Sequence, residues 1–294
     1  MPGTAELRTL RRRIRSTRNM QKITGAMELI AASRIARARA AVEQARPYAE
    51  GITRVISDLA TSTDVLEHPL LEQREKIETA GVVVITSDRG LAGAYNTNVL
   101  RRAERVIREV RDRGQQIALY QVGRKGENFF RFRGESFTDT WSGVTDKPNY
   151  DAAVDIGQRV MDDYREGHID ELRLVYTDFR TTLTQVPTAV RLLPIEHRAF
   201  LGGEAYPPQF IFEPTPDEIL ERLLPRYIEH RLYAALLESA ASEHASRQRA
   251  MKAASDNAEE IVGQLTREAN AARQAAITTE ISEIVGGAEA LAEQ

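Results

Sequence analysis

The sequence predicts an α/β protein with a long antiparallel coiled coil of N- and C-terminal helices plus a central α/β domain with a mainly parallel sheet. Three observations predict this fold. The stretch from Arg226 to Val285 contains no proline and a single glycine, Gly263. The first sixty residues have a similar composition and apolar spacing. Between these ends, short apolar runs alternate with helical stretches, which is typical of a parallel sheet covered by helices.

The C-terminal helix is expected within residues 212–294. Sixty helical residues form a rod of about 90 Å, longer than a compact domain of this size is wide. Apolar and small residues recur every three or four positions and form one seam, so the helix needs a partner along one side. The expected seam consists of Met251, Ala254, Ala258, Ile261, Leu265, Ala269, Ala272 and Ala276.

The N-terminal helix is expected over residues 1–60 and supplies that partner. Its expected seam consists of Leu7, Leu10, Ile14, Met20, Ile23, Met27, Ile30, Ala38, Val42 and Ala45. Pro47 removes a backbone donor, but apolar spacing resumes at Ile52 and Ile56, which favours a kink over an end. Pro225 indicates a kink or a boundary near the start of the second helix.

The middle of the chain, residues 78–205, is expected to form a Rossmann-like domain. Gly81–Thr86 is a continuous apolar run, as expected for a strand that is buried on both faces. Further strands are expected at 117–122, 136–141, 171–177 and 186–193. Helices are expected at 96–113, around Phe129–Phe132 and at 152–164. Pro207, Pro208, Pro214 and Pro216 indicate the linker that returns to the second long helix.

Charge is distributed unevenly along the chain. Residues 1–40 carry ten basic and two acidic side chains, a net charge of +8, so the rest of the chain carries −11 of the total of −3. A basic helix end of this kind is typical of proteins that bind an acidic protein surface, nucleic acid or an anionic membrane. There is no cysteine, which excludes disulfides and thiolate metal sites and fits a reducing compartment. No apolar run approaches the roughly 20 residues that span a bilayer.

The sequence offers no catalytic, cofactor-binding or metal-binding constellation. Gly90 and Gly93 do not make a dinucleotide fingerprint, and no phosphate-binding P-loop occurs. Gly123-Arg-Lys-Gly126 is a weak anion-binding signal. The five histidines are expected at the surface, and so are three acidic groups near one helix end, Asp162, Asp163 and Glu166. Ser242 and His244 are expected on an exposed rod, where nothing would exclude water or orient a base.

The end of the C-terminal helix is unusual for a solvated coiled-coil flank. Beta-branched residues such as Ile277, Thr278 and Thr279 crowd a helix that could have used better helix formers. Apolar Ile284 and Val285 extend beyond the point at which the N-terminal helix should end. An apolar tip without a partner in its own chain indicates a partner elsewhere.

Four strings, in this order, resemble the gamma-subunit family of F-type ATP synthases. They are Met20–Ser33 (MQKITGAMELIAAS), Thr86–Gly93 (TSDRGLAG), Met251–Asn257 (MKAASDN) and Ala272–Gly287 (ARQAAITTEISEIVGG). The resemblance covers both ends and the middle of the chain. It implies the central rotor shaft, which is not catalytic itself and couples proton-driven rotation of a membrane ring to ATP synthesis or hydrolysis at the beta subunits.

The resemblance also implies partners and a location. The partners would be three alpha and three beta subunits, the epsilon subunit and the membrane rotor ring of c subunits, with no nucleic acid and no direct membrane insertion. The location would be the cytoplasmic face of the bacterial inner or plasma membrane, as a peripheral part of the ATP synthase. No cofactor and no metal would be bound by this chain.

By the same resemblance, ten residues are expected to bind the ring of alpha and beta subunits. They are Lys22, Met27, Ala92, Arg247, Arg273, Gln274, Thr278, Ile281, Ile284 and Val285. Arg273, Gln274 and Thr278 would be bearing contacts, with Arg247 further down the same helix. Lys22, Met27 and an exposed loop at Ala92 would face acidic helix-turn-helix segments of beta, which suits the basic N-terminal helix.

Two other classes of protein remain as alternatives. A coiled-coil adaptor with a degenerate nucleotide-binding domain would bind nucleic acid through residues 8–22, and this binding would weaken steeply with salt. A dehydrogenase-type enzyme is the third hypothesis, and the missing phosphate fingerprint counts against it.

Overall fold

The computed structural model describes all residues except 1, 63–67, 196–212, 214 and 293–294. The expected linker prolines Pro207, Pro208 and Pro214 therefore lie outside the described residues, whereas Pro216 is the first residue of the second long helix and not part of a linker. The chain divides into two compact units, one formed by residues 1–31 and 248–294 and the other by residues 32–247. We call them the coiled-coil unit and the sheet unit. Among the described residues, no helix is both long and apolar enough to span a membrane.

Two long helices occupy the ends of the chain. Helix α1 runs from Pro2 to Ser62 and helix α5 from Pro216 to Ala292. Each contains one internal proline, Pro47 in α1 and Pro225 in α5. Helix α1 therefore continues past Pro47, as the apolar spacing predicts. The sequence predicts either a kink or a helix boundary at Pro225. Helix α5 begins before Pro225, so a boundary at this residue is excluded.

The coiled-coil unit packs the first turns of α1 against the distal half of α5. Leu10, Leu265 and Ala269 form its buried cluster, with Leu7, Ile14 and Ala272 packed around it. Early residues of one helix meet late residues of the other, so the pair is antiparallel. The repeating spacing of three and four residues thus builds one continuous apolar seam at this end.

The expected seam is wrong between residues 20 and 30 of α1. Met20, Ile23 and Ile30 are more than half exposed, whereas Thr24 and Ala31 are buried. The buried face carries small or polar side chains, and a Cβ on Gly25 would lie 3.9 Å from Ser255 Oγ. The Thr24 hydroxyl donates to the carbonyl oxygens of Met20 and Gln21, both at 3.1 Å, so its burial leaves no unsatisfied donor. Small residues allow the two backbones to approach closely, and the larger apolar side chains are left outside.

One residue of the expected seam on α5 is also misplaced. Ile261 is largely exposed, and Val262 lies on the inner side instead. The inward positions step from Ala258 by four residues and then by three to Leu265. Periodicity alone does not decide between steps of three and four, because both lie near the helical repeat of 3.6.

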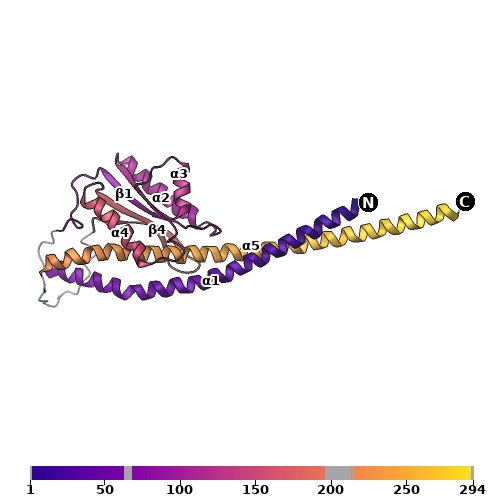
Figure 1. The fold of residues 1–294 in the computed structure, drawn as a ribbon, viewed down its shortest axis with the longest axis horizontal. Coiled ribbons are helices and arrows are strands. Elements are labelled where there is room, and N and C mark those ends of the chain that lie inside the picture. Colours follow the sequence, from indigo (N-terminus) through magenta and orange to yellow (C-terminus); the bar gives the residue numbers. More distant parts are fainter. Residues whose placement is uncertain (1, 63–67, 196–212, 214, 293–294) are drawn as a thin grey trace. The chain divides into compact units, whose positions relative to one another are not determined.

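The sheet unit contains a five-stranded sheet in the order β3-β2-β1-β4-β5 (Figure 1). The strands are β1 (Thr79–Ile85), β2 (Gln116–Val122), β3 (Asp139–Trp141), β4 (Glu171–Phe179) and β5 (Gln185–Leu193). The pairs β1–β2, β1–β4 and β2–β3 are parallel, whereas β5 pairs antiparallel with β4. The mainly parallel sheet is confirmed, with an antiparallel strand at one edge.

Alternate residues of β1 point to two separate cores. Val82 and Val84 contact the cluster that includes helices α2 (Tyr95–Asp112) and α3 (Arg124–Phe132). Val83 and Ile85 belong to the other cluster, with residues of α4 (Tyr150–Arg165) and of the sheet-unit parts of α1 and α5. Because both faces are covered, the strand reads as a continuous apolar run.

The sheet-unit parts of α1 and α5 are themselves part of this second core. Ile52, Ile56 and Leu59 of α1 and Leu224 and Ile228 of α5 are buried in it. The His230 ring nitrogen Nε2 lies 3.0 Å from the backbone oxygen of Ala45 and links the two helices directly. The C-terminal part of α1 and the N-terminal part of α5 are therefore built into the sheet unit.

Candidate partner-binding site

The distal end of α5 presents uncovered apolar and polar groups. Ile281, Ile284 and Val285 are each more than half exposed, and Ile277 is nearly so. Arg273, Gln274 and Thr278 are exposed as well. The Thr278 hydroxyl donates to the Gln274 backbone oxygen at 3.0 Å, which satisfies this polar group within the helix. All six expected tip residues therefore lie on one exposed helical segment, the distal tip of α5.

A basic groove runs along the coiled-coil unit. It has a volume of about 490 Å³ and an open, polar lining. Its cations are Arg11, Arg15, Arg18, Lys22 and Arg273, and no acidic residue lines it. None of these five forms an ion pair within the part of the chain that the structure describes. Two expected site residues, Lys22 and Arg273, thus lie in one groove, which suits an anionic partner.

An exposed apolar stripe lies on α1. It consists of Met20, Ile23 and Ile30, and Leu29 is exposed on another side of the helix. Met27, an expected site residue, is only partly exposed. Sequence reasoning assigned this stripe to the seam and therefore missed it as a surface. The signal that could have found it is the presence of Thr24, Gly25 and Ala31 close to the stripe in the sequence, because small residues favour a close helix contact.

Ala92, in the loop that follows β1, is buried, so the expectation that it is exposed is wrong. Ala92 is 3% exposed, whereas its neighbour Leu91 is 62% exposed. Leu91 has a φ of 62°, a left-handed conformation that non-glycine residues rarely adopt. The loop therefore turns Leu91 outward and Ala92 inward. If this loop contacts a partner, Leu91 rather than Ala92 supplies the surface.

Arg247, expected as a surface contact further down α5, is buried instead. Its guanidinium donates to Glu243 Oε1 at 2.5 Å, to His244 Nδ1 at 3.2 Å and to the Gly90 backbone oxygen at 3.1 Å. Arg247 thus connects α5 to the loop that contains Leu91. The structure brings Arg247 and the Ala92 loop together, and within this chain Arg247 acts as a support of the loop.

The expectation that Ser242 and His244 are exposed is also wrong. Both are buried, as is Glu243 between them. Burial raises the pKa of Glu243 to about 7, and the charge of Arg247 opposes this rise only in part. Burial and the neighbouring Arg247 lower the pKa of His244 to about 4. The sheet unit covers this part of α5 completely, which helical periodicity could not indicate.

The carboxyl ends of β1 and β2 are the place at which such a sheet would bind a nucleotide phosphate. Here the Asp88 carboxylate accepts hydrogen bonds from the Arg124 N–H at 3.2 Å and from the Thr145 hydroxyl at 2.8 Å. The Thr86 hydroxyl oxygen accepts from the Gly126 N–H at 2.9 Å, and the Ser87 carbonyl accepts from the Lys125 N–H at 3.0 Å. The first N–H groups of α3 are therefore satisfied by the chain's own loop rather than left free for an anion.

The pKa of Asp88 agrees with its role as a carboxylate that accepts hydrogen bonds at the start of α3. Burial raises its pKa, but hydrogen bonds from Gly143, Thr145 and Arg124 outweigh that effect and leave the pKa below its ordinary value. Asp88 is thus held as a carboxylate at the start of α3, where a helix N-terminus favours negative charge.

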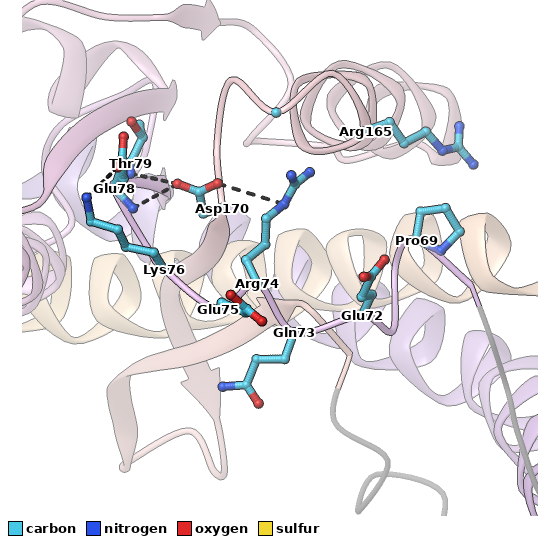
Figure 2. Close-up of a pocket in the computed structure, with 11 residues that line it drawn as sticks. Pro69, Glu72, Gln73, Arg74, Glu75, Lys76, Glu78, Thr79, Arg165 and Asp170 are labelled. Atoms are coloured by element: carbon cyan, nitrogen blue, oxygen red, sulfur yellow. Dashed lines mark hydrogen bonds and ion pairs between the residues drawn. The ribbon is translucent and has the colours of Figure 1, made fainter.

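A second polar pocket of about 650 Å³ lies at the opposite ends of the strands (Figure 2). Asp170 Oδ2 accepts from the backbone N–H groups of Glu78 and Thr79, and its other oxygen lies 3.8 Å from Arg74. Lys76 pairs with Glu78 at 2.6 Å. Figure 2 shows these charges directed at one another, so the central groups of this pocket are engaged in holding the 72–79 segment.

Asp163, Glu166 and His168 lie close enough to hold a metal ion. Asp163 is buried, contrary to the expectation of a solvated charge. Its carboxylate accepts from the Tyr120 hydroxyl at 2.5 Å and pairs with Arg159 at 3.3 Å and with His168 at 3.3 Å. With both oxygens engaged by protein groups, Asp163 serves to hold Tyr120 rather than to bind a cation.

The expectation of surface histidines is wrong for three of the four that the structure describes. His68, His230 and His244 are buried, and His168 is exposed. His197 lies outside the described residues. The sequence suggested exposure because the histidines are scattered through loops and charged helix faces, but tertiary packing decides which of them are covered.

Comparisons with known proteins agree with this picture. The family model for ATP synthase matches residues 6–291. The ATP synthase gamma chain of Thermobifida fusca is 51% identical over 98% of this chain and 97% of the relative, and that of Saccharopolyspora erythraea is 50% identical over 98% of both. A chain of the Euglena gracilis mitochondrial ATP synthase, solved with OSCP, F1 and the c-ring, has a TM-score of 0.66 at 16% identity over 98% of this chain and 95% of that chain. At this identity the structural likeness supports the fold alone.

Proposed function

The chain belongs to the gamma-chain family of ATP synthases, and we propose that it acts as the central rotor shaft of such an enzyme. It turns within a ring of three alpha and three beta subunits and is joined to the epsilon subunit and the membrane ring of c subunits. In bacteria this places it at the cytoplasmic face of the plasma membrane. Catalysis belongs to the beta subunits, and this chain transmits rotation.

The observation that carries the proposal is the uncovered distal tip of α5. Ile281, Ile284 and Val285 expose apolar surface at the end of a long helix, where a partner outside the chain can surround them. Arg273, Gln274 and Thr278 supply polar groups just before them. A helix tip with both kinds of group suits a bearing, because contacts to a surrounding ring must form and break repeatedly as it turns.

The basic groove supports a second contact of the same shaft. Its five cations fit the acidic helix-turn-helix segments expected on the beta subunits. Lys22 lies in this groove, and Met27 belongs to the next turns of α1. Leu91, at the exposed loop of the sheet unit, takes the role first expected for Ala92.

The mechanism follows from asymmetry. The shaft presents a different side to each of the three catalytic sites, so at any one orientation the three sites favour three different conformations. Rotation therefore changes nucleotide affinity, and nucleotide binding in turn drives rotation. This chain contributes three unlike contact surfaces, namely the basic groove, the apolar stripe and the distal tip of α5. Each surface binds one conformation of a neighbouring subunit more tightly than the others.

A reversible cross-link tests this proposal. The chain has no cysteine, so Lys22→Cys introduces a unique thiol on an exposed position. In the purified complex it is paired with a cysteine in the acidic segment of beta, at a site where the two Cα atoms come within about 7 Å. We expect mild oxidation to stop multi-turnover ATP hydrolysis and a reductant to restore it.

The control is the complex that carries Lys22→Cys without the cysteine in beta, which should keep its turnover under oxidation. A fully cross-linked complex that hydrolyses ATP at the normal steady rate would show that this chain does not rotate against the ring.

A further inference from the structure

The outer surface of α2 carries a row of arginines that the proposed contacts with the ring do not use. Arg101, Arg105 and Arg108 are exposed, and their spacing of four and three residues places them on one helix face. Seven helical residues span about 10 Å, so the row covers roughly two turns. None of the three forms an ion pair within the described residues. We call these three residues the arginine row.

Two carboxylates near the arginine row are engaged with other partners, whereas Asp112 lies one turn beyond Arg108 on the same helix face. Glu104 pairs with Arg133 of the segment that follows α3, and Glu135 pairs with Arg111 at 2.6 Å. Residues 95–135 contain ten basic and five acidic side chains, a net charge of +5 in a chain whose total is −3. The local acidic groups therefore do not neutralise the arginine row, which is a concentrated positive surface in an otherwise acidic part of the chain.

A cleft lies beside the end of the arginine row, between α2 and α3. It has a volume of about 370 Å³, and Ile107 and Phe130 lie at its apolar base. Arg108, Arg111 and Arg133 line it together with Glu104 and Glu135. The guanidinium of Arg133 stacks over the Phe129 ring at 4.0 Å, which holds one wall in place. Arg108 belongs both to the arginine row and to the cleft, so the two features form one surface.

We propose that this surface, on the outside of the sheet unit, binds an acidic helical segment of a protein partner. Three arginines at i, i+4 and i+7 match carboxylates with the same spacing on a partner helix, because both helices have the same rise and pitch. The planar guanidinium binds a carboxylate through two parallel hydrogen bonds, which gives orientation as well as charge. One apolar side chain of the partner enters the cleft beside Arg108.

The cleft favours a protein segment over other polyanions. A polyphosphate or nucleic-acid backbone has no aliphatic side chain to place against Ile107 and Phe130. A flat anionic bilayer would meet the arginine row but would not reach the base of a concave cleft.

The experiment uses the full chain and a fluorescent peptide as the probe. The peptide is an alanine-based helix with glutamates at i, i+4 and i+7 and one leucine a turn further on. We expect Arg101→Glu/Arg105→Glu/Arg108→Glu to reduce its affinity, measured by fluorescence anisotropy, by about tenfold or more. The affinity of the unmodified chain should fall as salt rises, because the charges are exposed.

Matched controls separate this surface from general charge. Arg39→Glu/Arg54→Glu/Arg222→Glu changes the net charge equally at exposed positions of the sheet unit and should keep the affinity of the unmodified chain. Both triple variants retain the basic groove, so any binding there cancels in the comparison. Replacing the three arginines of the row by lysine should give an intermediate affinity, and a peptide with glycine in place of leucine should bind more weakly. Circular dichroism checks that the total helix content of each variant is unchanged.

Three results would overturn the proposal. One is equal affinity of the arginine-row variant and the control variant. Another is equal binding of the leucine and glycine peptides. The last is that the arginine row proves necessary for binding phosphatidylglycerol vesicles or inorganic polyphosphate but not for binding the peptide, which would assign the surface to a membrane or to a polyanion.

Discussion

His244 is a buried histidine whose two ring nitrogens both have partners in the neutral state. Nδ1 accepts from Arg247 at 3.2 Å, and Nε2 lies 3.3 Å from the Asp146 backbone oxygen, to which it donates. Arg34, paired with Asp146, adds another positive charge nearby. A second proton on this ring would place a cation beside Arg247 in a buried site. The geometry and the lowered pKa therefore indicate the same neutral tautomer.

We predict that His244 makes the sheet unit sensitive to acid. Its folded pKa of about 4 lies below the unfolded value of 6.5, so its contribution is fully present above pH 6.5 and is lost as pH falls toward 4. The difference in unfolding free energy between the native chain and His244→Gln should shrink by about 3 kcal/mol over this range. Urea unfolding followed by the fluorescence of Trp141, the only tryptophan, measures it within the sheet unit.

The matched control is His168→Gln. His168 lies on the surface of the sheet unit, so its substitution changes the same residue type without removing a buried ring. A parallel pH dependence in the native chain and in His244→Gln would show that His244 is not the group that titrates.

At the scale of the elements, the turn from β2 into α3 depends on glycine. Gly123 has a φ of 95°, and a Cβ there would lie 2.4 Å from the Thr86 backbone oxygen. Backbone atoms cannot move aside as a flexible side chain can. The same turn allows the loop after β1 to satisfy the first N–H groups of α3, so a change here affects two loops at once.

We predict that Gly123→Ala destabilises the sheet unit by about 3 kcal/mol or more, from backbone strain and from the clash. Gly134→Ala is the matched control, because Gly134 also has a positive φ, 76°, but nothing lies within 4 Å of an added Cβ. It should cost only about 1–2 kcal/mol of strain. Urea unfolding of both variants gives the difference, and equal losses would exclude the clash with Thr86 as a cause.

At the scale of the whole molecule, the residues that stabilise the fold and the residues proposed to contact partners lie in different parts of the chain. The sheet unit buries two apolar cores, whereas the coiled-coil unit leaves the basic groove and the distal tip of α5 uncovered. Substitutions at the tip should therefore affect the assembled complex without unfolding the chain.

We predict that Arg273→Ala/Gln274→Ala/Thr278→Ala lowers ATP turnover of the assembled complex while the isolated chain keeps its helix content. Alanine is the best helix former, and these three side chains are exposed. Steady-state ATP hydrolysis and circular dichroism are the two measurements.

Glu260→Ala/Gln264→Ala/Arg267→Ala serves as the control at exposed positions lower on α5. It should leave turnover close to normal. If both triple variants turn over ATP as the unmodified complex does, the bearing lies elsewhere on the chain.

The sequence by itself determined the elements and the family. Glycine and proline positions, helical spacing and the apolar run at Gly81–Thr86 are local properties, and each predicted an element that the structure confirms. The four strings shared with the gamma-subunit family are also local sequence features, and they indicated the family. The uncovered tip could also be read, because its apolar residues continue beyond the length of the partner helix.

The tertiary structure alone decided which face of each helix is covered. Spacing placed Met20, Ile23 and Ile30 on the seam, but Gly25 and Ala31 let the backbones approach, and packing of small residues turned the larger ones outward. Arg247 and His244 looked exposed on a rod, yet the loops of the sheet unit cover them. A helical repeat of 3.6 residues fixes which side chains share a face, whereas the neighbour that packs against that face comes from residues far away in the sequence.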